Sequence, residues 1–119
     1  MDDPSPSESA PMWHVTLTVA GEPVPEHEIR RGLERLSAEH PFLLSGRYGD
    51  DCAEVRYWEE APDAGAVTSL ALRLWDDHRA SAMLPDWRVV GVEVVDRDTF
   101  HRRGRTTLSP VSLVGVGPF

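Results

Sequence analysis

The residues with the widest choice of chemistry in this chain are five histidines, a residue type that binds metals and exchanges protons near neutral pH. They lie at separate points of the sequence: His14, His27, His40, His78 and His101. No two of them are four residues apart and no Cys-x-x-Cys pair occurs, so the short ligand spacings of zinc sites are absent. We therefore expect no metal centre and no bound cofactor.

The single cysteine, Cys52, follows Asp50 and Asp51. Negative neighbours raise the pKa of a thiol, whereas reactive cysteines lie beside positive charge. Cys52 is therefore expected to be inert rather than a nucleophile. One cysteine also cannot form an intramolecular disulfide, which is typical of proteins from a reducing compartment.

Several residue types are missing altogether. All twelve cationic residues are arginine, and the chain has no lysine, asparagine or glutamine, a bias typical of high-GC bacterial genomes. This composition excludes a Schiff-base lysine and a carboxamide that lines an oxyanion hole or orients a flavin. Gly115 and Gly117, near the C-terminus, have neither the length nor the following helix of a phosphate-binding loop.

The net charge of −8 makes this an acidic protein and argues against a nucleic-acid partner, although residues 101–105 form a short basic run. No apolar run approaches the roughly 20 residues that a membrane-spanning helix needs. Residues 1–11 have neither the basic nor the apolar part of a signal peptide. We expect a bacterial cytoplasmic protein that binds neither nucleic acid nor membrane.

Hydrophobic periodicity shows which elements must position these side chains. Apolar residues alternate in four segments and recur at helical spacing in two others. In chain order these segments are residues 12–20, 26–40, 42–48, 53–59, 63–83 and 88–95, with the second and fifth helical. This order is typical of the ferredoxin-like βαββαβ sandwich, an α+β fold. We predict a four-stranded antiparallel sheet, strand order 4-1-3-2, with two helices on one face.

The ends of the chain differ from the domain between them. Residues 1–11 are acidic and rich in proline and serine, so we predict that they are disordered. Residues 12–103 form the ferredoxin-like domain, and Phe100 is expected to pack back on it. Residues 104–119 are too apolar for a solvated tail, so they either dock on the domain, add an edge strand or cross to a second subunit.

The apolar stripes also predict which residues share the core. Asp63 is the expected N-cap of the second helix. The second and third strands are expected to form a hairpin that pairs Arg47 with Glu54 and Leu43 with Trp58. The predicted core residues are Val15, Leu17, Ile29, Leu33, Leu36, Leu44, Val55, Val67, Leu70, Ala71, Leu74, Val90 and Val92.

The sheet face away from the helices is the candidate functional surface. The predicted register places on it His14, Thr16, Thr18, Arg47, Glu54, Arg56, Trp58 and Glu93. Leu43, Val89 and Val95 are predicted to lie between them, and with Trp58 they form more apolar surface than an open face normally leaves in water. We therefore predict an interface at Leu43, Trp58, Val89 and Val95. A second copy, the C-terminal tail, or a small ligand between two copies would cover it.

Two functions fit this surface. The first is a non-catalytic binding or assembly module that forms a homodimer through the open face. The alternative is an enzyme of the dimeric α+β-barrel kind, in which two such faces enclose a small anionic molecule. There His14 would be the general acid and base, Arg47 or Arg56 would hold the anion, and Trp58 would complete the ligand site.

Overall fold

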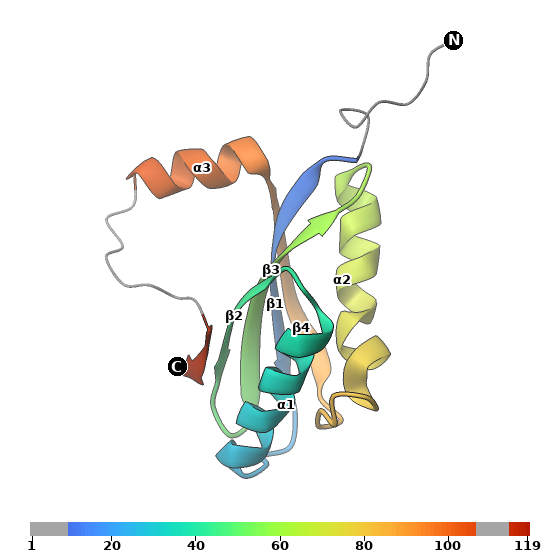
Figure 1. The fold of residues 1–119 in the computed structure, drawn as a ribbon, viewed down its shortest axis with the longest axis vertical. Coiled ribbons are helices and arrows are strands. Elements are labelled where there is room, and N and C mark those ends of the chain that lie inside the picture. The colour runs from blue at the N-terminus through green and yellow to red at the C-terminus, as the bar shows by residue number, and fades with distance from the viewer. Residues whose placement is uncertain (1–9, 107–114) are drawn as a thin grey trace.

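Five β-strands form one mixed sheet in the order β4-β1-β3-β2-β5 (Figure 1). The computed structural model describes residues 10–106 and 115–119. Its elements are β1 (Met12–Ala20), α1 (Glu26–Glu39), β2 (Leu43–Tyr48), β3 (Cys52–Glu60), α2 (Ala64–Arg79), β4 (Arg88–Asp96), α3 (Arg97–Thr106) and β5 (Gly115–Pro118). β1 pairs antiparallel with β3 and β4, β2 pairs antiparallel with β3, and β5 runs parallel to β2.

The α+β prediction is confirmed, but a four-stranded antiparallel sheet with two helices is wrong in two respects. β5 adds a fifth strand at the edge beside β2, which was one of the alternatives for residues 104–119. It is held by a hydrogen bond of 2.6 Å from Arg47 Nη1 to the Gly115 carbonyl and one of 3.0 Å from Phe119 N to the Tyr48 carbonyl. α3 follows β4 directly, in a stretch for which we predicted no helix. Phe100 is the only apolar side chain of α3, so no hydrophobic stripe revealed the helix.

The predicted domain boundaries can be compared with these elements only in part. Of the segment predicted to be disordered, residues 1–9 lie outside the described residues. The boundary predicted after residue 103 falls inside α3. Residues 107–114, in the predicted tail, again lie outside the described part of the chain.

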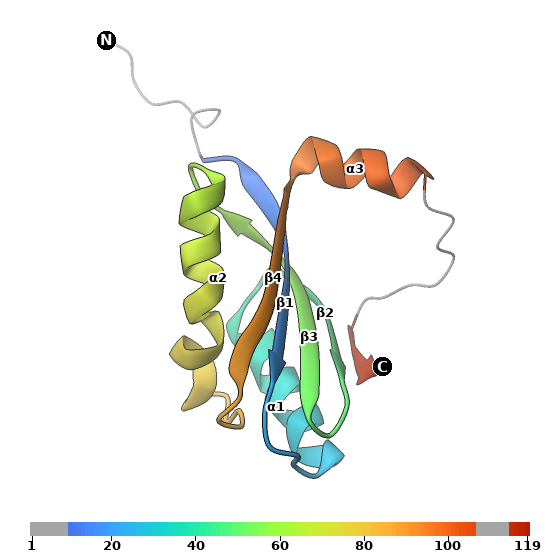
Figure 2. The ribbon, with the colours of Figure 1, turned by 180° about the vertical axis from the view of Figure 1, so that it is seen from behind.

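The hydrophobic core lies between the sheet and the layer formed by α1 and α2 (Figures 1 and 2). Asp63 caps α2 as predicted, because its side chain accepts a hydrogen bond of 2.8 Å from Ala66 N. Leu70 was expected in the core but is 36% exposed, whereas Trp75 is buried. The buried residues on the two helices are Ile29, Gly32, Leu33, Leu36, Val67, Ala71, Leu74 and Trp75.

A β-bulge in β4 reverses the sides predicted for two valines. Thr18 pairs with Gly91, but the next residue, Val19, pairs with Val89, so Val90 is the extra residue of the bulge. Val89 therefore packs against the core, and Val90 is 58% exposed. The prediction that Val90 is a core residue and Val89 lies on the open face is wrong, because one extra residue reverses the alternation of faces.

A second irregularity moves Leu43. The hairpin pairs Arg47 with Glu54 as predicted, but the register shifts between Leu43 and Ser45, so Leu43 lies opposite Tyr57 rather than Trp58. Leu43 consequently packs against the core. The prediction that Leu43 lies on the open face is therefore also wrong.

Candidate functional site

The candidate site is the sheet face opposite α1 and α2, which we call the open face. Side chains alternate along each strand, so β1 presents His14, Thr16 and Thr18 on the side away from the core residues Val15, Leu17 and Val19. Their partners on β3 and β4 lie on the same side. These partners are Glu54, Arg56, Trp58, Gly91, Glu93 and Val95.

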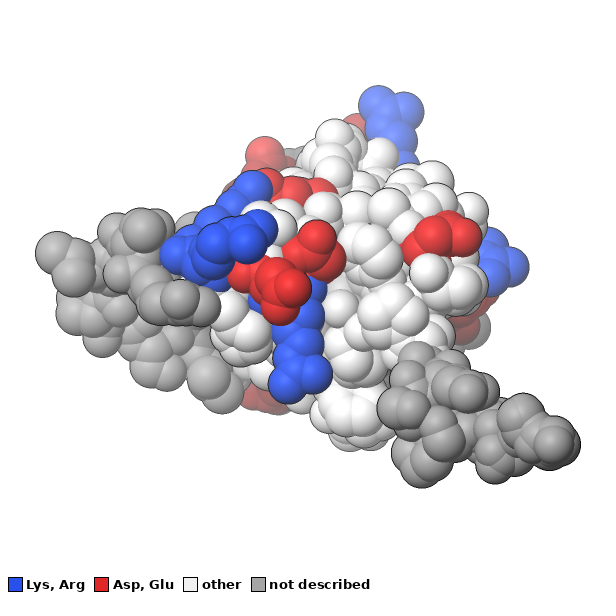
Figure 3. Space-filling view, turned by 90° about the horizontal axis from the view of Figure 1, so that it is seen from above, with Lys and Arg blue, Asp and Glu red and all other residues white. Residues whose placement is uncertain are grey.

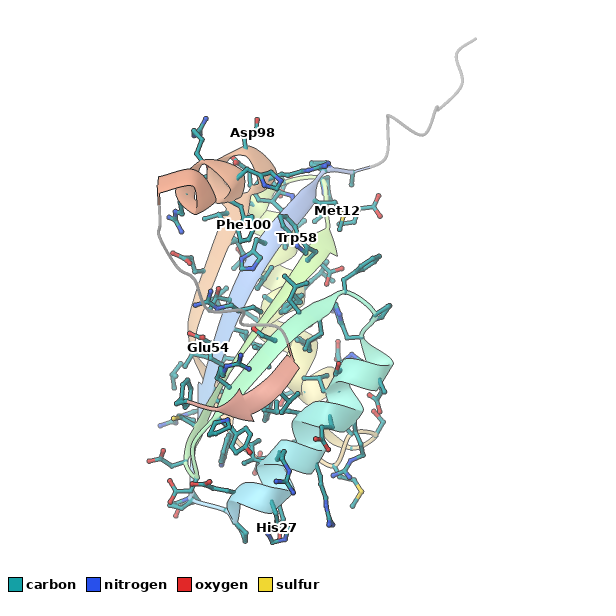
Figure 4. All side chains as sticks on the ribbon, turned by 60° about the vertical axis from the view of Figure 1, so that its left-hand side comes forward. Met12, His27, Glu54, Trp58, Asp98 and Phe100 are labelled. Atoms are coloured by element: carbon teal, nitrogen blue, oxygen red, sulfur yellow. The ribbon has the colours of Figure 1, made fainter. Side chains whose placement is uncertain are left out.

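An aromatic cluster of His14, Trp58 and Phe100 lies on this face near α3 (Figure 4). The Phe100 ring stacks on the His14 ring at a centroid distance of 4.2 Å. Trp58 meets His14 edge-on at 5.3 Å and Phe100 edge-on at 5.0 Å. As a result His14 is only 5% exposed, although it lies on the face without the two core helices.

The start of α3 explains why Phe100 reaches His14. Asp96, the last residue of β4, accepts a hydrogen bond of 2.7 Å from Thr99 N, which holds the first turn of α3 against the strand end. Val95, immediately before it, is the cross-strand partner of His14. Phe100 is thus presented to the sheet about one helical turn after Asp96.

The cluster determines the protonation state of His14. The pKa of His14 is lowered to about 4, mainly by burial and also by the charge of Arg56, while Glu93 opposes the shift. The imidazole is therefore neutral at neutral pH. A neutral ring covered by Phe100 is suited to packing. It does not have the two properties of a general acid and base, which are contact with the substrate and a pKa near the working pH.

The two arginines predicted to hold an anion lie in different surroundings. Arg56 Nε lies 3.4 Å from Glu54 Oε1 on the same strand. Arg47 Nη1 bonds to the carbonyls of Gly46 at 3.0 Å and Gly115 at 2.6 Å. The structure thus brings Arg56, Trp58 and His14 to one face, whereas Arg47 links β2 to β5.

Of the four predicted interface residues, Trp58 and Val95 lie on the open face and are partly buried, Trp58 within the aromatic cluster and Val95 opposite His14. Leu43 and Val89 pack on the core side for the reasons given above. Sequence reasoning missed a hollow of about 370 Å³ beside Trp58 at the α3 end of the face. It is lined by Met12, Phe42, Trp58, Arg97 and His101.

Charges at this end of the molecule are mixed. The space-filling view from above shows basic and acidic side chains next to one another (Figure 3). Arg103 Nη1 lies 3.3 Å from Glu93 Oε2, which joins α3 to β4. The basic run that the sequence shows at residues 101–105 therefore includes an arginine paired with a sheet carboxylate.

Two further histidines meet between the helices and β3. His78 Nδ1 lies 2.7 Å from Glu39 Oε1, and His40 Nε2 lies 3.6 Å from Glu59 Oε1. The centroids of the two imidazole rings are 6.4 Å apart. Even so, the described residues contain no group of three or more His, Cys, Asp or Glu side chains that could hold a metal ion.

Burial and the neighbouring Asp51 raise the pKa of Cys52, in the direction that the sequence predicted.

Among the described residues, no helix combines the length and the apolar character needed to cross a membrane.

Comparison with known families identifies the domain. A family model described as a domain of unknown function (DUF8830) matches residues 12–110. The chain belongs to this family. The match begins at the first residue of β1 and extends past Thr106, the last residue of α3, so α3 is part of the DUF8830 domain. Comparisons with curated proteins and with solved structures gave no match.

Proposed function

We propose that this DUF8830 domain is a non-catalytic binding and assembly module that forms a homodimer through its open face. The observation that carries the proposal is the apolar surface around the hollow at the α3 end. Phe42 is 56% exposed there, and Trp58, another lining residue, is only partly buried. A surface of this kind is typical of an interaction site.

The charges of the open face support a second copy as the partner. In a two-fold interface the same patch meets itself, so a surface of one sign would repel its copy. The open face carries both signs, with Glu54 beside Arg56 and Glu93 beside Arg103. Such a mixed surface can be complementary to its own copy.

The geometry of His14 favours the non-catalytic function over the enzyme. An acid and base catalyst must reach its substrate, whereas His14 is covered by Phe100 and has a pKa of about 4. The candidate anion-binding residues Arg47 and Arg56 each already contact a protein oxygen. We therefore assign the aromatic cluster a structural role in holding α3 on the sheet.

A charge placed on the open face should separate the copies. Phe42→Glu and Val95→Asp are expected to give folded proteins with unchanged circular dichroism and half the wild-type mass in sedimentation velocity, since each new charge meets its own copy. Met83→Glu is the matched control, because Met83 is also apolar and 68% exposed but lies in the segment between α2 and β4. The proposal is wrong if both open-face variants keep the wild-type mass.

A further inference from the structure

The two edges of the sheet differ. One edge is β5, a strand of four residues that ends at Pro118. The other edge is β4, a strand of nine residues. Within residues 10–106 and 115–119, no strand pairs with the outer side of β4 (Figure 2). An edge strand of this kind presents a row of backbone donors and acceptors that can pair with another chain.

The outer side of β4 has an apolar margin. Val90, in the bulge, is 58% exposed and Leu72 of α2 is 51% exposed. Together with Val89 they line a hollow of about 690 Å³ beside the start of the strand. The bulge interrupts regular pairing at Val90. From Gly91 to Asp96, three of the six residues are valine, a residue type well suited to a sheet.

We propose that the outer side of β4 pairs antiparallel with β4 of a second copy, so that the two sheets become continuous. α3 does not obstruct this pairing, because it extends from the end of β4 toward the β2 side of the molecule (Figure 2). α2 of each copy then lies on the same side of the joined sheet, where Leu72 and Val90 lose their exposure.

Symmetry restricts the register. A two-fold axis perpendicular to an antiparallel pair places one residue directly opposite its own copy. An axis at Glu93 would place two carboxylates side by side, which is unfavourable. An axis at Val92 places Glu93 opposite Gly91 of the second copy and a valine opposite a valine. We therefore assign the axis to Val92.

The charges of the edge agree with this register. Arg88 and Glu93 lie on the open-face side of β4, because their partners on β1 are Ala20 and Thr16. Antiparallel pairing about Val92 brings Arg88 of each copy to the end of the other strand, opposite its Asp96. The start of β4, which carries Arg88, thus faces the acidic end of β4 in a second copy of this chain, which makes the edge complementary to itself.

A cysteine cross-link tests the axis directly. In a Cys52→Ser background, Val92→Cys should oxidise to a covalent dimer, because directly opposed residues have Cβ atoms about 4.5–5.5 Å apart, near disulfide geometry. Val90→Cys is the control: residue 90 is more exposed, but the register places it opposite residue 94. We expect at least several-fold more dimer from position 92 on a non-reducing gel. Equal or greater cross-linking at position 90, or none at position 92, would overturn the proposal.

A second variant tests the edge pairing even if Val92→Cys does not fold. Val90→Lys introduces an edge charge at an exposed position and should lower the mass of the otherwise wild-type protein, while Met83→Lys should not. An unchanged mass in Val90→Lys would contradict the edge pairing.

The edge and the open face are separate surfaces, so this inference does not rest on the proposed function. Adding Phe42→Glu to the Val92→Cys variant should leave the cross-link intact. Loss of the cross-link in that combination would contradict an independent edge interface. When the two axes cross at right angles, a protein that uses both surfaces is a closed tetramer, and each set of variants should reduce it to a dimer.

Discussion

Replacing Phe100 with alanine is expected to raise the pKa of His14 from about 4 toward its ordinary value of 6.5. Burial is the largest cause of the lowered pKa, and the Phe100 ring stacked at 4.2 Å supplies much of that burial. Once the ring is removed, water reaches the imidazole and stabilises its charged form. An NMR titration of the imidazole resonances measures this pKa directly.

The matched control for Phe100→Ala is Phe119→Ala. Phe119 is 66% exposed and follows β5, so its removal should leave the pKa of His14 unchanged. If the pKa of His14 stays near 4 in Phe100→Ala, α3 does not cover the histidine as described.

The same shift predicts how stability depends on pH. The pKa of His14 is lower in the folded chain than in the unfolded chain, so the unfolded chain binds more protons between about pH 4 and 6.5. The contribution of His14 to stability is therefore present above pH 6.5 and is lost as the pH falls toward 4. Phe100→Ala should lose less stability than wild type over that range.

Replacing Trp75 with alanine should cause the largest loss of stability. Trp75 is 1% exposed, and its ring stacks on Trp87 at a centroid distance of 6.2 Å. Its indole N–H also donates to the Pro85 carbonyl at 3.0 Å. We expect a loss of about 3–5 kcal/mol in the free energy of unfolding, from lost burial and the cavity that remains. Urea denaturation monitored by circular dichroism measures it.

Leu72→Ala on the same helix provides the comparison. Leu72 is 51% exposed, so its truncation in a monomeric background should cost less than about 1 kcal/mol. A similarly small loss for Trp75→Ala would mean that α2 does not pack on the sheet through its tryptophan.

Local patterns were sufficient to predict most of the sheet. β1 was predicted with its observed ends, because nine residues alternate without interruption. The pairing of Arg47 with Glu54 followed from the short hairpin loop. Asp63 was recognised as a cap because an aspartate before a helical stripe accepts a backbone hydrogen bond.

The incorrect predictions concern features that depend on tertiary structure rather than on local sequence. The bulge at Val90 inserts one residue relative to β1, and nothing in the valine-rich sequence of β4 marks where that residue lies. Leu70 fits the helical spacing, but the buried stripe of α2 runs through Val67, Ala71, Leu74 and Trp75, and Leu70 lies at its margin with 36% exposure. β5, with the sequence Gly-Val-Gly-Pro, has no strand period and depends on pairing with β2.

The candidate site was also predicted only in part. Alternation along β1 and β3 was enough to place His14, Arg56 and Trp58 on one face. The burial of His14 depends on α3, whose sequence contains a single apolar anchor, Phe100. A histidine that looked accessible from its strand position is therefore enclosed.

The central proposal is that this DUF8830 domain associates with itself, and the mass of the wild-type protein in solution tests it most directly. One chain has a mass of 13.3 kDa. Light scattering at micromolar concentration should give a multiple of that mass for the wild-type protein. A mass of 13.3 kDa that stays constant as the concentration rises through this range would contradict the proposal.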